Sequence, residues 1–199
     1  MKKITLFSLP LLYAFVLLVT TPLTGQTPKG WFPSGSNPKD YKMGTVTGVP
    51  CEGQKCGHMK SIFSVIDGFG TYMQTISSEK YLGKRVRMTA RMKTKNVQTW
   101  ACMWMQVVDP KRSDKNLAYD NMENRQLKGT IDWTLCEIVL DVAEGSGAVA
   151  FGFILEGTGE IWFDSVKFEI VDKSVPVTDM MAGSPSGLPP EPSNLDFEE

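Results

Sequence analysis

Two tryptophans and a glutamine stand at even spacing in one short apolar run, Trp100 to Val107. Side chains two residues apart on a β-strand point to the same face, so Trp100, Trp104 and Gln106 share a face. Aromatic faces stack on the apolar side of sugar rings, and amides bind the hydroxyl groups. The run therefore predicts a carbohydrate-binding strand face. The alternative is that both tryptophans fill the space between two sheets, because tryptophan is mostly buried.

A polar segment follows this run and adds groups that form hydrogen bonds. It contains an aromatic phenol, a carboxylate, an amide and a guanidinium. Side chains of these types orient a sugar in a pocket. The predicted ligand-binding residues are Trp100, Trp104, Gln106, Tyr119, Asp120, Asn121 and Arg125.

Residues that could perform catalysis are scarce. The sequence has no Gly-x-Ser-x-Gly elbow, no phosphate-binding loop and a single histidine, His58. Zinc is a poor alternative, because there is only this histidine and no second cysteine pair has ligand spacing. Glu137 and Asp141 stand two strand-face positions apart, a spacing that glycosidase carboxylates can have, although surface acids at this spacing are common. We therefore expect a protein that is not an enzyme.

A second run alternates basic and apolar residues. Its basic residues are Lys84, Arg85, Arg87, Arg91 and Lys93. Its apolar residues are Val86, Met88, Ala90 and Met92. This alternation predicts a half-buried strand with a solvated basic face. The alternative is that the basic face holds an acidic sugar or a phosphate.

Similar runs recur along the chain and must position these side chains. We expect further strands at Trp133 to Val142, Ala148 to Leu155 and Glu160 to Val171, and weaker ones at 61–65 and 71–76. The turn Gly157-Thr158-Gly159 is a hairpin signal between two of them. Many short strands at regular spacing predict an all-β fold, an antiparallel β-sandwich.

The first 25 residues have the pattern of a cleaved secretory signal peptide. Lys2 and Lys3 precede an apolar run from Ile4 to Val19, which is shorter than the ~20 residues of a membrane-spanning helix. A retained membrane anchor is the alternative. Cleavage removes both lysines and changes the net charge from −1 to −3. We therefore expect a secreted or periplasmic protein with no nucleic acid partner, and with no membrane partner after cleavage.

Export places the four cysteines where disulfides persist. Cys51 and Cys56 flank a short loop that contains glycine, so their spacing and export together predict a local disulfide. Cys102 and Cys136 lie in apolar runs. They are either buried thiols or a second disulfide.

Several short segments together resemble the successive strands of galactose-binding-like jelly rolls, which include bacterial carbohydrate-binding modules. These segments are Trp31–Ser36, Phe69–Gln74, Tyr81–Val86, Asp120–Met122 and Gly159–Asp164. The similarity covers roughly residues 30 to 172. It implies a jelly-roll sandwich and is less specific for function, because one fold serves many functions.

Modules of this type commonly begin with a segment like Asn-x-x-Phe-Glu, and here the matching segment is Asn194–Glu198. The resemblance implies a circularly rearranged jelly roll with residues 1–25 as signal, 26–172 as β-sandwich, 173–193 as a Pro/Gly/Ser-rich linker and 194–199 as the completing strand. Alternatively, the tail is disordered or begins a second domain. A small group of uncharacterised bacterial proteins shares such a tail. Some are described as transcriptional regulators, which the signal and the acidic charge do not support.

The same resemblance implies a structural calcium ion but no other cofactor. In many such modules the matching glutamate and aspartate help to hold the ion, and the corresponding residues here are Glu198 and Asp164. Backbone carbonyls and waters can complete the six to eight oxygens that calcium takes. The alternative is that Asp164 caps a turn and Glu198 is solvated.

The sequence favours an exported, non-catalytic module that binds carbohydrate or another polymer of the cell envelope. The alternatives are an envelope structural or interaction protein with no small-molecule site, and a relative of the proteins described as regulators.

Overall fold

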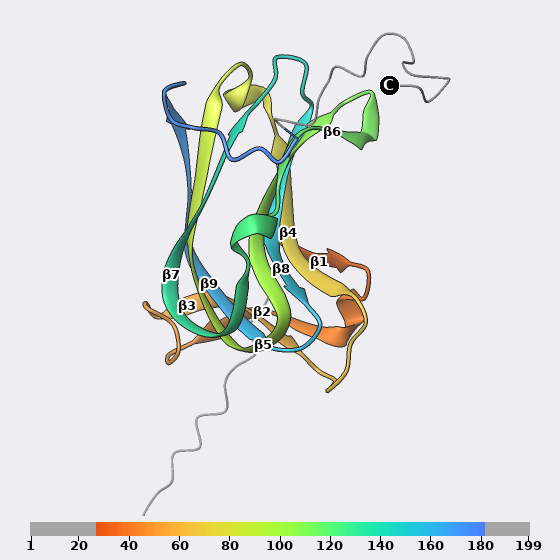
Figure 1. Ribbon diagram of the computed structural model, residues 1–199, viewed down its shortest axis with the longest axis vertical. Helices are drawn as coiled ribbons and strands as arrows, with labels where there is room; N and C mark the ends of the chain where they lie inside the picture. The colour runs from red at the N-terminus through yellow and green to blue at the C-terminus, as the bar shows by residue number, and fades with distance from the viewer. Residues whose placement is uncertain (1–26, 182–199) are drawn as a thin grey trace, which may run out of the picture.

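One long strand, β5 (Arg85–Asp109), organises the fold (Figure 1). In the computed structural model, which describes residues 27–181, its first part pairs with β7 and β9 and its last part pairs with β8 and β6. The change occurs near Asn96, whose φ of 53° lies in the left-handed region. The same strand therefore belongs to both layers of a sandwich.

The other elements, in chain order, are β1 (Phe32–Gly35), η1 (Pro38–Asp40), β2 (Tyr41–Thr47), β3 (Lys55–Ser61), β4 (Phe69–Ser77), η2 (Glu79–Tyr81), β6 (Arg112–Asp120), η3 (Glu123–Arg125), β7 (Leu127–Asp141), β8 (Ala148–Glu156) and β9 (Glu160–Val171). The front layer has the order β1, β4, β8, β5, β6, and the back layer has the order β2, β3, β9, β5, β7. All the pairs are antiparallel. The predicted all-β antiparallel sandwich is confirmed.

The two-residue alternation correctly identifies which residues of β5 are buried. Val86, Met88, Ala90 and Met92 are almost fully buried, and so are Ala101, Met103, Met105 and Val107 in its last part. Aromatic rings from the opposite strands fill the space between the layers. Phe153 of β8 stacks on Phe163 of β9 with ring centroids 4.0 Å apart.

Two expectations for the strands are wrong. Residues 62–66 form a loop, and the strand in this region is β3 instead, because Lys55–Ser61 pairs along the whole of β2. The Gly157-Thr158-Gly159 turn is not a hairpin turn, since β8 and β9 do not pair with each other. It carries the chain from the front layer to the back layer, because both strands pair with β5, one on each side of its bend.

Residues 178–181 hold one open side of the sandwich together. The Thr178 amide donates to the Val139 carbonyl of β7 at 2.8 Å, and the Met180 amide donates to the Tyr119 carbonyl of β6 at 2.9 Å. Asp179 accepts the Tyr119 amide in return, at 3.0 Å. The segment therefore covers an edge of each layer, and edges of sheets otherwise leave backbone groups unpaired.

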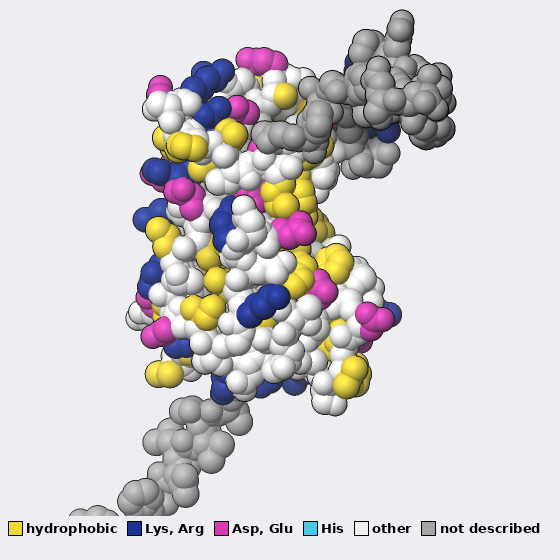
Figure 2. Space-filling model, viewed as in Figure 1, with side chains coloured by type: hydrophobic (Ala, Val, Ile, Leu, Met, Phe, Trp, Pro, Cys, Tyr) yellow, Lys and Arg dark blue, Asp and Glu magenta, His cyan; other side chains and the backbone are white. Residues whose placement is uncertain are grey.

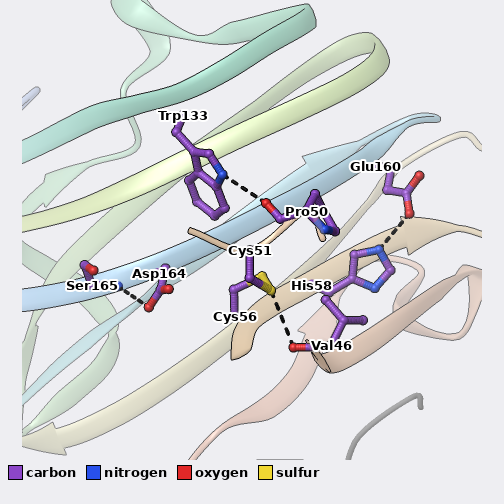
Figure 3. Close-up of a disulfide and its surroundings, with 9 residues drawn as sticks. All are labelled: Val46, Pro50, Cys51, Cys56, His58, Trp133, Glu160, Asp164 and Ser165. Atoms are coloured by element: carbon purple, nitrogen blue, oxygen red, sulfur yellow. Dashed lines mark hydrogen bonds and ion pairs between the residues drawn. A yellow bond between two sulfur atoms is a disulfide. The ribbon is translucent and has the colours of Figure 1, made fainter. Parts of the chain in front are cut away.

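The predicted disulfide between Cys51 and Cys56 is confirmed (Figure 3). It closes the loop between β2 and β3, and this loop packs against the back layer through Trp133, whose indole donates to the Pro50 carbonyl at 3.1 Å. Cys102 and Cys136 are free and buried, so the first of the two alternatives for them holds. Burial raises the pKa of both thiols, that of Cys136 to about 11, which keeps them unreactive.

The expected signal peptide, residues 1–25, lies outside the described residues, and so does the tail, 194–199. Within residues 27–181 no helix is long and apolar enough to cross a membrane.

Replacing both Cys51 and Cys56 by serine should lower the free energy of unfolding by about 2 kcal/mol, because the short loop gains freedom in the unfolded chain. Urea unfolding measures this. Reduction should bring the wild type to the stability of the variant and leave the variant unchanged. A thiol reagent that labels Cys51 or Cys56 in the native, unreduced protein would contradict the disulfide.

Candidate functional site

A groove crosses the outer face of the front layer. The side of the molecule formed by this layer is hollowed between β6 and β1 (Figure 2). The groove has a volume of about 380 Å³, and it extends from β1 at one edge of the layer to β6 at the other. Its middle part is lined by Thr71, Met73, Trp104 and Ile154, and its end at β6 is lined by Gln106 and Tyr119.

Trp104 forms the floor of this groove. On the neighbouring strand β8 it stands opposite Gly152, which has no side chain, so the indole crosses this strand and donates to the Thr71 hydroxyl of β4 at 2.8 Å. The Thr71 hydroxyl donates in turn to the Phe153 carbonyl at 3.0 Å. Trp104 is only 7% exposed, so it is a flat floor rather than a projecting platform.

Gln106 and Tyr119 face each other across β5 and β6 at one end of the groove. Both side chains are half-buried. Within residues 27–181 the Gln106 amide makes no hydrogen bond, so its donor and acceptor atoms remain available in the groove. Burial raises the pKa of the Tyr119 phenol, which is therefore neutral at physiological pH.

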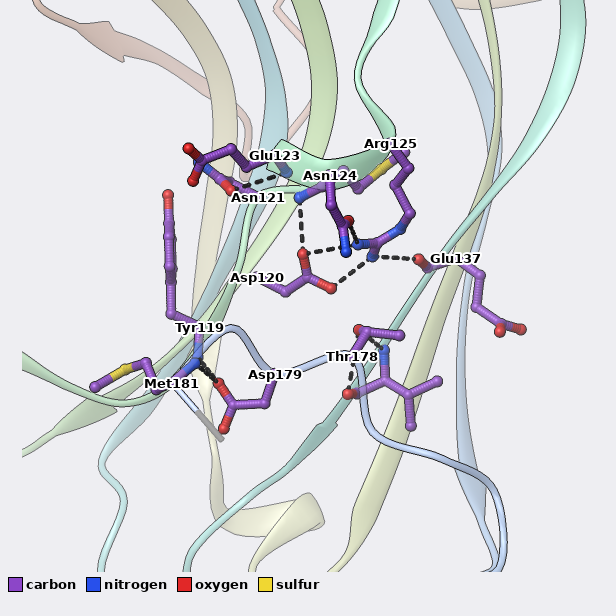
Figure 4. Close-up of polar contacts among 12 residues, drawn as sticks. Tyr119, Asp120, Asn121, Glu123, Asn124, Arg125, Glu137, Thr178, Asp179 and Met181 are labelled. Carbon is purple, nitrogen blue, oxygen red and sulfur yellow. Dashed lines mark hydrogen bonds and ion pairs between the residues drawn. The ribbon is translucent and has the colours of Figure 1, made fainter. Parts of the chain in front are cut away.

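Asp120 and Arg125 form a structural pair rather than part of the groove (Figure 4). Asp120 is fully buried, and its Oδ2 accepts from the Arg125 guanidinium at 2.5 Å. The Met122 amide donates to Asp120 Oδ1 at 2.7 Å, and Arg125 donates to the Glu137 carbonyl of β7 at 2.9 Å. These bonds fix η3 between β6 and β7. They occupy the polar atoms that the sequence assigned to a ligand.

The structure therefore divides the predicted binding set. Trp104, Gln106 and Tyr119 come together in the groove. Trp100 is half-buried and opposite Glu156, and it does not line the groove. Asn121 accepts the Glu123 amide at 3.2 Å, so its side-chain oxygen is engaged at the start of η3.

Six groove residues escaped the sequence analysis, namely Ser34, Gly35, Phe69, Thr71, Met73 and Ile154. Thr71 and Met73 lie on β4, and Ile154 lies on β8. The alternation of β4 places its odd-numbered residues on one face, but short polar and apolar residues there carry no chemical signal by themselves. Only the order of strands in the front layer brings them beside Trp104.

The basic face of the back layer is neutralised by acids. Arg85 pairs with Asp141 at 2.8 Å, Arg91 with Glu52 at 2.8 Å, and Lys93 with Asp132 at 2.8 Å. The hydrogen bond from Arg85 holds the pKa of Asp141 below its ordinary value. These ion pairs favour the interpretation that the basic face is solvated over the alternative that it holds an acidic sugar or a phosphate.

Glu137 and Asp141 do not form a catalytic carboxylate pair in this arrangement. Glu137 lies 3.7 Å from the Arg87 guanidinium, and Asp141 is bound by Arg85. His58 forms a hydrogen bond of 2.9 Å with Glu160, and this bond lowers the pKa of that carboxyl (Figure 3). Each of these groups therefore has a structural partner.

Only one of the two predicted calcium ligands, Asp164, lies within the described residues. Among residues 27–181 no group of three or more acidic, histidine or cysteine side chains could hold a metal. Asp164 Oδ1 accepts the Ser165 amide at 2.6 Å inside β9, where Ser165 has a φ of 56°, so Asp164 is not at a turn. Glu198 lies outside the described residues, so the calcium site stays a prediction.

Comparison with known sequences finds one relative of similar sequence and no matching family model. The relative is called an uncharacterized HTH-type transcriptional regulator, YbfP, of Bacillus subtilis (strain 168). It is 44% identical over 172 residues, which are 86% of this chain and 57% of that protein. The chain thus spans little more than half the length of this relative.

Solved structures match the fold at low sequence identity. The xylan-binding module of family 22 from Paenibacillus barcinonensis Xyn10C has a TM-score of 0.53 at 12% identity, over 75% of this chain and 90% of that one. The chain has the β-sandwich fold of carbohydrate-binding modules. The enzymatically active domain of the bacteriophage CBA120 tailspike protein 4 gives 0.55 at 14% identity, over 72% of this chain and 20% of that one. These identities show the fold alone.

Replacing Asp120 by alanine should destabilise the protein by about 3 kcal/mol, because the Arg125 charge and the Met122 amide lose a buried partner. Asp141→Ala is the matched control. It breaks an exposed ion pair and should cost less than about 1 kcal/mol. Urea unfolding of both variants measures the difference, and equal losses would contradict a structural role for Asp120.

Proposed function

We propose that this protein is a non-catalytic module that binds a carbohydrate chain in the groove over Trp104. The observation that carries this proposal is the groove itself, which combines an apolar floor with free polar atoms. The Trp104 indole supplies a flat surface for the apolar side of a sugar ring, and Tyr119 supplies a second aromatic side chain. The unpartnered Gln106 amide supplies a donor and an acceptor for hydroxyl groups.

The shape of the groove favours a chain of sugars over a single ring. It crosses the front layer from β1 to β6, and five adjacent strands span about 19 Å. The fold is also that of modules described as xylan-binding. A β-linked polysaccharide is therefore the ligand class we would test first, with export to the cell envelope or beyond as the expected setting.

A regulatory role is the second candidate, because the similar Bacillus subtilis protein is called an HTH-type transcriptional regulator. Residues 27–181 contain strands and short 3₁₀-helices but no helix-turn-helix. The matched part is 57% of that relative. In this candidate the chain corresponds to a part of a regulator that binds a ligand, and the same groove is its site.

Affinity electrophoresis in gels that contain polysaccharides, with xylan among them, tests the binding proposal. The wild type should be retarded by at least one polysaccharide. Tyr119→Ala should weaken binding at least tenfold, or by about 1.4 kcal/mol, and Gln106→Ala about fivefold through the lost hydrogen bonds. Both variants should melt within a few degrees of the wild type.

Gln98→Ala and Phe63→Ala are the matched controls, since both residues are exposed and neither lines the groove. Equal retardation of all four variants, or no retardation in any gel, would leave the envelope interaction protein as the better description.

A further inference from the structure

The sandwich is open on the side opposite residues 178–181. β9 pairs with β3 only through 160–163, so residues 164–171 have β5 as their one partner strand within the described part of the chain. On the front layer, β4 pairs with β1 only through 70–73, which leaves 74–77 without a neighbour on that edge among residues 27–181. Within residues 27–181, both edges therefore present backbone donors and acceptors with no strand to pair with, although the Ser165 amide donates to Asp164.

A cleft of about 400 Å³ lies between these two edges and reaches the core. Gln74 lines it from β4, Val166 and Phe168 line it from β9, and Trp31 contributes its indole. The cleft also contains the buried Tyr72 hydroxyl, which has no hydrogen-bond partner among residues 27–181. The Thr27 side chain approaches this hydroxyl without reaching hydrogen-bond geometry. A buried polar group of this kind ordinarily finds a partner.

We propose that this cleft is a strand-addition site and that the chain's own residues 194–199 occupy it. An extended segment along 164–171 would pair with the open edge of β9 and direct alternate side chains into the cleft. The segment has that alternation, because Leu195 and Phe197 are apolar whereas Asp196 and Glu198 are charged. Leu195 and Phe197 would pack on Val166 and Phe168, and the charged residues would face water.

The connecting residues are long enough for this placement. Met181 is held near Tyr119 at the β6 edge by its neighbour Met180. Residues 182–193 reach up to about 40 Å when extended. The path around the sandwich crosses about five strands, or roughly 20 Å. The tail can therefore reach the opposite side of its own molecule.

Hydrogen exchange on the full chain tests the proposal directly. In the wild type, the amides along 164–171 that point away from β5 should be protected. The variant Leu195→Asp with Phe197→Asp should speed their exchange more than tenfold and lower the melting temperature by roughly 5 °C or more. Asp196→Asn, on the other face of the segment, is the control and should leave the exchange rates and the melting temperature unchanged. Fast exchange at these amides in the wild type would overturn the proposal.

A second variant tests the place of docking. Val166→Asp should speed the exchange of the same amides. Adding the tail substitutions to this variant should cause little further loss of stability, because both changes disrupt the same contact between the tail and Val166. Lys167→Asp changes the opposite face of the same strand and should have no such effect. Fully additive losses would overturn docking at Val166. Light scattering should give a monomer, and a dimer that dissociates in the tail variant would assign the strand to a second copy and overturn the proposal.

Discussion

The fold depends on the hydrogen bonding of β5 along both of its edges. Its first part lies between β7 and β9, and its last part lies between β6 and β8, so both layers are built on one strand. The inward side chains of both parts are almost fully buried. The outward side chains differ, because most are basic before the bend at Asn96, whereas Trp100, Trp104 and Gln106 follow it. One strand therefore carries an ion-paired surface on the back layer and the groove on the front layer.

The groove depends on a residue that has no side chain. Gly152 lies between Trp104 of β5 and Met73 of β4, and a Cβ at this position would stand 2.4 Å from the Tyr72 carbonyl oxygen. β4 therefore packs too closely on Gly152 for any side chain to stand there. The Trp104 indole lies across β8 and reaches Thr71. A protruding tryptophan would bind a sugar by its exposed face. Here the ring makes the base of a depression, so binding also needs the residues around it.

Local pattern was enough to predict most of the fold but only part of the site. Alternation along β5 gives the correct buried face, and the loop between Cys51 and Cys56 is short enough for their disulfide. Alternation cannot show which strands become neighbours, so the sequence missed Thr71 on β4. It also cannot distinguish a ligand-binding carboxylate from one with an internal partner. Asp120 was placed in the site for its chemistry, yet Arg125 and the Met122 amide occupy it.

The groove and the open cleft lie on opposite faces of the same strand, β4. Thr71 and Met73 point into the groove, whereas Tyr72 and Gln74 point into the cleft between the layers. β1 covers β4 only as far as residue 73, so the rest of this edge has no neighbour within residues 27–181. A strand in the cleft would contact the side chains of Tyr72 and Gln74 on the inner face of β4 and restrain them. Because the hydroxyl of Thr71 positions the Trp104 indole, completing the sandwich on this side would also fix the floor of the groove.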